Sequence, residues 1–277
     1  MTILSVAILL SIFAAPAFAQ TDPREIVRKS VQTDDRNAKL TSEYTYVVHN
    51  TMRQLDGGGK VKSTETDTHE ILFIGGKRYS RLTEKDGKPL PPKEEAKQQQ
   101  HIDHAIAEAK KLSPDERERR LAERERKRAK DREGIRNIPA AFDFVLFREE
   151  NVGGRPAYVI GVTPKAGYRG PNHDFLSKMQ GTLWIDKADY HWVKAEAETL
   201  DTISWGLFIA RLSKGSRLSF EQTRVNDEIW LPRRAAVKAS ARLGLVKKFN
   251  IEQDTTFSNY RKFSTDSKII SATEVPQ

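Results

Sequence analysis

Alternation of apolar and polar side chains is the main pattern of this chain, and it is clearest between Gly181 and Thr199. Two alternating runs flank a short polar turn at 187–189, which predicts an antiparallel hairpin with one face on a core or a cavity. The simplest register places Trp184 opposite Trp192 on the charged face. The opposite, apolar face then consists of Leu183, Ile185, Val193, Ala195 and Ala197.

Similar runs occur on both sides of this hairpin, and short turns rich in glycine, asparagine or aspartate join them, which predicts a meander. Together they give about ten or eleven antiparallel strands, too many for a flat open sheet, so the sheet should curl. The fold class that we expect is therefore mainly β (α+β). The strands expected outside the hairpin are 44–52, a run ending at 74, 77–82, 142–152, 155–164, 203–212, 217–226, 229–241 and 245–257.

Helices are expected near the N-terminus and in a charged insert. Asp22 followed by Pro23 is typical of a helix start. The insert, 93–136, holds 14 Lys and Arg against 11 Asp and Glu. Its first half has apolar residues at helical spacing and should pack on the sheet. Its second half, 113–135, opens with the capping box Ser113 to Glu116 and has almost no apolar face, so we expect a solvated arm. The stripe of the first half is Ile102, Ala105, Ile106, Ala109 and Leu112.

The first twenty residues indicate the compartment. They form an apolar run that ends in the small-x-small pattern Ala17-Phe18-Ala19, so we expect a signal peptide at 1–19, cleaved after Ala19, and a periplasmic protein. No other stretch is long and apolar enough to cross a membrane. The expected organisation is one domain over 20–263, interrupted by the insert, and a polar tail at 264–277.

Composition narrows the chemistry further. The chain of 277 residues contains no cysteine, which excludes disulfides, thiolate metal sites, cysteine nucleophiles and a lipid-modified cysteine. Its formal charge is +9 and its charged fraction is 31%, while the hydrophobic fraction is 38%. A basic surface suits an anionic partner such as a lipid head group or is simply well solvated. Interleaved glutamates in the insert cancel the field of its Lys and Arg run, so a nucleic-acid partner is not expected.

Candidate catalytic and metal-binding residues are sparse. His101 and His104 lie three residues apart on a predicted helix, but no carboxylate completes a metal site. His49 and His69 are expected to face each other across the first hairpin as a cross-strand pair. No nucleophile elbow, phosphate-binding glycine loop or HExxH motif occurs, and no acid-base pair is marked. We therefore expect no catalytic residues, no metal and no cofactor, and an enzyme is the least favoured function.

Three short motifs carry a family resemblance. Gly181 to Asp186, GTLWID, resembles a strand of the outer-membrane lipoprotein-sorting (LolA-like) family, followed in order by Tyr190 with 194–198 and by Ile229 to Pro232, IWLP. The likeness is best over 142–260, and the charged insert departs from the family pattern. The resemblance implies a half-open antiparallel β-barrel with helices over its mouth, whose concave face and lid shelter acyl chains.

The resemblance and the alternation together suggest a non-catalytic periplasmic carrier for lipoproteins or other acylated, apolar ligands. Envelope sensing or protein binding through the arm at 113–135 is the alternative, and an ordinary packed core is the plain explanation for any one apolar position. The residues expected on the ligand-binding concave face are Leu183, Ile185, Val193, Ala195, Ala197, Trp205, Leu207, Phe220, Leu231, Val237, Phe249 and Ile251.

Overall fold

One antiparallel sheet organises the computed structural model, which describes residues 22–205, 210–243, 247–263 and 269–271. Eleven strands follow one another in the order β4-β3-β2-β1-β13-β12-β11-β8-β7-β6-β5, and the short strands β9, β10 and β14 pair beside this path. In that order the strands are β4 (Lys88–Pro89), β3 (Lys77–Lys85), β2 (Val61–Ile74), β1 (Tyr44–Leu55), β13 (Lys247–Phe263), β12 (Ile229–Leu243), β11 (Arg217–Val225), β8 (Trp192–Thr199), β7 (Met179–Asp186), β6 (Arg155–Pro164) and β5 (Phe142–Val152).

The sheet is curved and does not close, because the two end strands, β4 and β5, do not pair with each other. Neighbours along the path are mostly neighbours in sequence, as a meander requires. There are two exceptions. β1 pairs with β13, which joins the strands before the insert to those after it, and β8 pairs with β11, which skips the β9–β10 segment. The fold class is therefore the expected one: a half-open antiparallel barrel of eleven main strands with covering helices and a charged helical insert.

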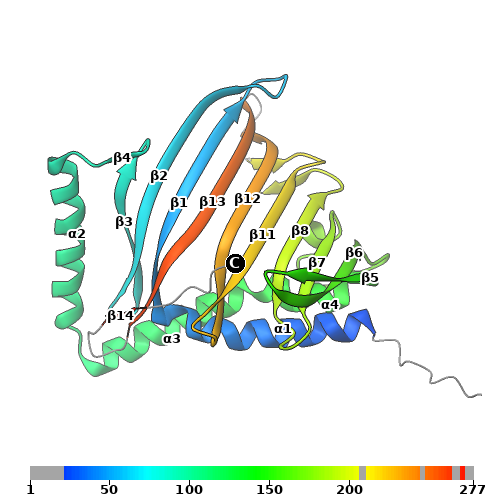
Figure 1. The fold of residues 1–277 in the computed structure, drawn as a ribbon, viewed down its shortest axis with the longest axis horizontal. Helices are drawn as coiled ribbons and strands as arrows, with labels where there is room; N and C mark the ends of the chain where they lie inside the picture. The colour runs from blue at the N-terminus through cyan, green and yellow to red at the C-terminus, as the bar shows by residue number, and fades with distance from the viewer. Residues whose placement is uncertain (1–21, 206–209, 244–246, 264–268, 272–277) are drawn as a thin grey trace, which may run out of the picture.

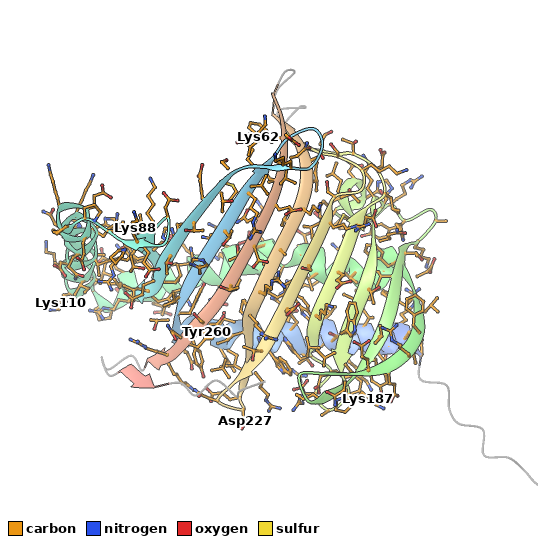
Figure 2. All side chains as sticks on the ribbon, turned by 45° about the horizontal axis from the view of Figure 1, so that its top comes forward. Lys62, Lys88, Lys110, Lys187, Asp227 and Tyr260 are labelled. Atoms are coloured by element: carbon orange, nitrogen blue, oxygen red, sulfur yellow. The ribbon has the colours of Figure 1, made fainter. Side chains whose placement is uncertain are left out.

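Helices gather at one end of the strands (Figure 1). There α1, α3 and α4 run across the strand ends, while α2 stands beside β3 at one edge of the sheet. In Figure 2 the helices that cross the strand ends lie behind the strands, while α2, marked by Lys110, stands beside the sheet, so that the other face of the sheet is turned to the viewer. The helices are α1 (Pro23–Leu40), the 3-10 turn η1 (Thr41–Glu43), α2 (Pro92–Lys110), α3 (Pro114–Asp131), α4 (Glu133–Ala141) and α5 (His173–Leu176).

The first helix begins where the sequence predicts and covers the sheet with its apolar side. The Asp22 carboxylate accepts a hydrogen bond from the Arg24 amide at 2.9 Å, which caps the first turn. Ile26 and Val27 then meet Ile160 and Ile185 in a cluster in which every side chain is at most 1% exposed. Burial of aliphatic side chains on both partners fixes α1 against β6 and β7.

A second cluster closes the same face beside it. It joins Phe142 and Val162 to Leu176 of α5, and partly buried Leu183, Ala197 and Leu218 pack against it together with Ile138 of α4. We call the side of the sheet that meets α1, α4 and α5 the helix-facing side, and the opposite side the open face. Over β5 to β8 and β11, the helix-facing side is a filled core.

The charged insert forms the expected helices, but its second half is not a free arm. α2 buries Ile102 and Ala105 beside the sheet, as expected. α3 has no buried residue, and apart from Glu116 its half-buried positions form a stripe of arginines four residues apart that continues into the α4 cap. This stripe, which we call the arginine stripe, consists of Arg120, Arg124, Arg128 and Arg132.

Contacts of the arginine stripe fasten α3 to the strand ends and to α1. The Arg124 guanidinium lies 5.1 Å from the centre of the Phe73 ring, and Arg128 donates to the Thr41 hydroxyl at 3.2 Å. Arg132 donates to Asp35 at 3.1 Å and also to the buried Asp34. Cation–π and charge-assisted contacts thus replace the usual apolar stripe.

The register of the central hairpin differs from the predicted one. A register shift between Trp184 and Ile185 pairs Trp184 with Lys194 and Ile185 with Trp192. The cause is the turn: Asp186 accepts the amides of Ala188 and Asp189 at 2.9 and 3.1 Å, and Tyr190 adopts a positive φ of 59°. Trp192 therefore packs on the helix-facing side and Val193 with Trp184 on the other, so the predicted tryptophan pair and the placement of Val193 were wrong.

Two further predictions need correction. The run at 203–212 is not one strand, because β9 (Ile203–Trp205) and β10 (Ala210–Leu212) pair with each other as a hairpin. Part of the predicted polar tail, β14 (Ile269–Ser271), pairs with the end of β13. The expected signal peptide lies outside the described residues. Among the helices of the described ranges, none is long and apolar enough to span a membrane.

Candidate functional site

A groove of about 870 Å³ crosses the open face of the sheet from β5 to β1. Its lining includes Val145 and Phe147 at one end and Arg53 at the other. Register assigns it to the open face: most lining positions alternate with Val162, Ala197 and Leu218, whose side chains pack toward the helices. Binding cavities for small ligands measure about 300–1,000 Å³, so the groove has the volume of a ligand site.

Small side chains leave the space for the groove on this face of the sheet. Pairing aligns one row of the open face across six strands, and four of its six members are Gly161, Thr182, Ser219 and Ala236. The next row of the same face carries long polar side chains and forms a wall. These wall residues are Gln180, Glu198, Arg217, Lys238, Glu252 and Arg53.

One end of the groove is apolar and exposed. Val145 and Phe147 of the edge strand β5 are 59% and 58% exposed, among the most exposed large apolar side chains that the structure describes. A register shift between Leu146 and Arg148 turns Phe147 to the open face. Its ring lies over Gly161, where a Cβ atom would come within 2.2 Å of the ring. Glycine at this position therefore leaves room for the ring against β6, where it forms an apolar floor.

Ion pairs line the rest of the groove, and their charges balance. Lys238 Nζ lies 2.6 Å from Glu252 and Arg217 Nε lies 4.0 Å from Glu198. Arg234 Nε donates to Asp254 at 2.9 Å, and this hydrogen bond raises the pKa of the Arg234 guanidinium. The pairs are largely exposed, so each contributes little to stability. The lining is thus mixed, with apolar floor and paired charges, and it suits an amphipathic ligand.

Two smaller hollows adjoin the groove along the strands. One, of about 280 Å³, lies toward the β1–β2 turn, which Lys62 marks in Figure 2. It shares Arg217 and Lys238 with the groove. The other, of about 450 Å³, lies toward the opposite strand ends and borders Arg155, Arg224 and Trp230.

Residues predicted on the ligand-binding face are only partly brought together. Ala197 and Val237 border the groove and Ile251 borders the smaller hollow, but by register the side chains of Ala197 and Val237 lie with Leu218 on the helix-facing side. Leu183, Ile185, Ala195 and Phe220 belong to the helix-facing side by register or packing. Val193 lies with Trp184, and Leu231 is buried with Tyr44 and Tyr260. Phe249 is half-buried on β13, the Trp205 backbone pairs with Ala210, and Leu207 lies outside the described residues.

The histidines form no metal site in the described part of the chain, where no group of three or more His, Cys, Asp or Glu side chains could hold an ion. The predicted pairing of His49 with His69 was wrong. His49 pairs with Thr68 and His69 with Val48, so the two rings point to opposite faces. The Nδ1 atom of His49 lies 3.0 Å from the Thr68 hydroxyl.

One buried histidine was not singled out from the sequence. His191 is fully buried, its ring is 5.4 Å from that of Trp230 and nearly parallel to it, and its Nε2 lies 3.1 Å from the Gln222 amide oxygen. Burial lowers the pKa of His191, and the Gln222 hydrogen bond opposes this only in part. It is a structural histidine at the α1 end of the sheet, away from the groove lining.

Comparison with known proteins gives distant likenesses. No family model and no curated protein matches the chain. A DUF1329 family protein from Desulfovibrio piger is 15% identical, with 87% of this chain and 94% of that chain covered and a TM-score of 0.36. A putative outer membrane lipoprotein-sorting protein domain from Vibrio parahaemolyticus is 12% identical, with 86% and 94% covered and a TM-score of 0.35. A LolA superfamily protein from Nitrosomonas europaea is 11% identical, with 88% and 94% covered and a TM-score of 0.32.

Identities of 11–15% and TM-scores of 0.32–0.36 are too low to assign a role to this chain. Function has to be argued from the residues of this chain.

Proposed function

We propose that the protein is an exported, non-catalytic binding or carrier protein for an acylated or other elongated amphipathic ligand, which it holds in the groove of the open face. The observation that carries the proposal is the groove itself. It is long, open to solvent, apolar at the Val145 and Phe147 end, and lined elsewhere by paired charges. The apolar run at 1–19 supports export.

Such a groove binds a ligand by shielding its apolar part from water. Each buried methylene contributes about 0.8 kcal/mol, so a chain lying over Phe147 and Ala236 gains affinity without specific polar contacts. The paired charges along the walls remain solvated and accept a polar head or backbone without leaving an unpaired charge behind. The filled core on the helix-facing side needs no rearrangement in this scheme.

A matched pair of valines tests the groove. Val145 and Val61 are both exposed strand residues, at 59% and 47%, but only Val145 lines the groove. We expect Val145→Asp to weaken binding of a fluorescent fatty acid by about tenfold or more, because a charge replaces apolar contact. Val61→Asp should bind like the native chain.

Native mass spectrometry of the protein purified from a periplasmic extract provides the second readout. The native chain and Val61→Asp should carry co-purifying acylated compounds, and Val145→Asp should carry fewer. Equal fatty-acid affinity in all three proteins, with no acylated compound bound, would contradict the proposal.

Protein binding through the insert is the second candidate, and one observation favours it. Leu121 on α3 is 50% exposed, on the insert rather than on the sheet. A partner protein that binds this side of α3 would have lower affinity for the Leu121→Glu variant, whereas fatty-acid binding in the groove would not change. Unchanged capture of envelope proteins by Leu121→Glu would rule out this candidate.

A further inference from the structure

The small hollow beside the groove differs from the groove in charge. The hollow has a volume of about 280 Å³, and its lining includes three cations, Lys214, Arg217 and Lys238, and no Asp or Glu. Ser240 and Asn250 are the polar neutral residues on its floor. A concave site lined by positive charges concentrates anions, and Lys and Arg are the usual ligands of phosphate and carboxylate groups.

A rigid turn positions Lys214. The turn at 213–216 is fastened to β8 by the Thr199 hydroxyl, which donates to Ser213 at 2.8 Å and accepts from the Ser216 amide at 2.9 Å. The Gly215 amide donates to the Thr199 carbonyl at 2.8 Å, and Ser216 is 2% exposed. The apex residue Lys214 is exposed above this fixed base, and none of the ion pairs among the described residues involves it.

The other two cations stand directly opposite each other. Arg217 and Lys238 are cross-strand partners of β11 and β12, and both point to the open face. Like charges in this position destabilise a sheet unless other groups compensate them. Glu198 lies 4.0 Å from Arg217 and Glu252 lies 2.6 Å from Lys238, each on the outer side of the pair and in the groove lining. The side that faces the small hollow has no such carboxylate in its lining.

The opposite rim is formed by the β1–β2 turn, whose carboxylate is engaged elsewhere. Asp56 accepts the amides of Gly58 and Lys60, both at 2.9 Å, and these hydrogen bonds lower the pKa of the Asp56 carboxyl. Asn250 donates to the Asp56 carbonyl at 3.1 Å and accepts from Ser240 at 2.7 Å, which ties the floor to this rim. The hollow is therefore a built depression between two anchored turns.

From this arrangement we propose that the hollow formed by Lys214, Arg217 and Lys238 binds a compact anionic head group, phosphate or carboxylate, whose attached chain lies in the groove. The proposal rests on the proposed function and names the class of its ligand: an anionic amphiphile. Arg217 and Lys238 line both spaces and form the passage between head and chain.

Two ligands with the same chain test it. Isothermal titration calorimetry of the native protein with dodecyl phosphate and with dodecyl glucoside, both below micelle formation, compares an anionic with a neutral head. We expect the phosphate to bind about tenfold more tightly, the size of one charge-assisted hydrogen bond. Raising the ionic strength should remove much of this preference and leave glucoside binding unchanged.

The Lys214→Gln variant isolates the head site, because Lys214 lines the small hollow and not the groove. We expect it to weaken dodecyl phosphate binding and to leave dodecyl glucoside binding intact. Lys77→Gln is the matched control: Lys77 is equally an exposed lysine, on β3 far along the sheet, and its replacement should change neither affinity. Equal affinity of the two ligands, or no effect of Lys214→Gln, would overturn the head site.

Inorganic phosphate separates a lipid-type head from a free anion. If inorganic phosphate binds as tightly as dodecyl phosphate, the chain contributes nothing and the proposed amphiphile is wrong. Failure of the groove looks different from failure of the head site. In the first case Val145→Asp changes neither dodecyl ligand, and in the second it still weakens both to the same extent.

Discussion

The two faces of one sheet differ in how their side chains are covered, although the same strands supply both. On the helix-facing side, Ile160 and Ile185 are fully buried beneath Ile26 and Val27 of α1. On the open face, a row of small residues leaves a groove, and Val145 and Phe147 stay more than half exposed.

This difference shows that an apolar stripe on a strand does not by itself mark a binding site. Ile185 is more apolar than Thr182, but its side chain is already covered by the protein's own first helix. Space for a ligand arises instead where small side chains, Gly161 and Ser219 among them, lie between rows of long ones. The following predictions test the contrast from the largest expected effect to the smallest.

Ile185→Ala should cost the most stability. The side chain is fully buried between α1 and the sheet, so its truncation leaves a cavity and should lower the free energy of unfolding by about 2–5 kcal/mol. Val145→Ala on the open face should change it by less than about 0.5 kcal/mol. Urea unfolding measures both, and similar losses at the two positions would erase the contrast between the faces.

Asp186→Asn should cause the second-largest loss of stability. This carboxylate is fully buried, accepts two hydrogen bonds from Arg155 at 2.5 and 2.8 Å and caps the turn that sets the hairpin register. Burial alone would raise the pKa of Asp186, but Arg155 and the amides of Asp189 and Ala188 hold it below the ordinary value. Loss of the charge should cost about 1.5–3 kcal/mol in urea unfolding. Asp174→Asn, on a side chain outside this network, serves as the control.

Arg132→Gln should weaken the attachment of the insert. Arg132 donates to both Asp34 and Asp35 of α1 and is 18% exposed. Removing these charge-assisted hydrogen bonds should cost about 1–3 kcal/mol and speed hydrogen exchange in α3. Arg126→Gln, on the exposed side of the same helix, should do neither. Equal exchange rates in the two variants would mean that α3 is a free arm after all.

A dependence of stability on pH should come from His191. Because burial lowers its pKa in the folded state, the unfolded chain takes up the proton first as pH falls. His191 therefore contributes full stability above its ordinary pKa of about 6.5, and this contribution is lost as pH falls toward the lowered pKa of the folded state. The groups that influence it are Asp34, Asp189 and Arg132. His191→Gln should flatten stability between about pH 7 and pH 5, relative to the native curve; an unchanged slope would assign the effect to other groups.

Much of the architecture could be predicted from local patterns. The meander, the start of α1 at Pro23 and the capping box at Ser113 follow from alternation and from side chains that act on their own backbone. The pairing of β9 with β10 was missed because the alternation of side chains in the sequence runs on past Trp205 without a break.

The site was harder to predict because it depends on register. The register shift between Trp184 and Ile185 places Trp192, in place of Val193, on the helix-facing side. The register shift between Leu146 and Arg148 turns Phe147 to the open face. No periodicity marks such shifts, since turn geometry fixes them. The arginine stripe was visible at four-residue spacing, yet its partners Phe73, Thr41 and Asp34 are known only from the fold.

Photo-crosslinking tests most directly whether the open face holds the ligand. A dodecyl phosphate analogue with a diazirine on its chain would be bound, irradiated and mapped by peptide mass spectrometry. The open-face groove predicts adducts on Val145, Phe147 and Ala236, and their loss in Val145→Asp. Adducts on Leu183 or Ala195, or on α1 and α4, would contradict it and return the ligand to the helix-facing side.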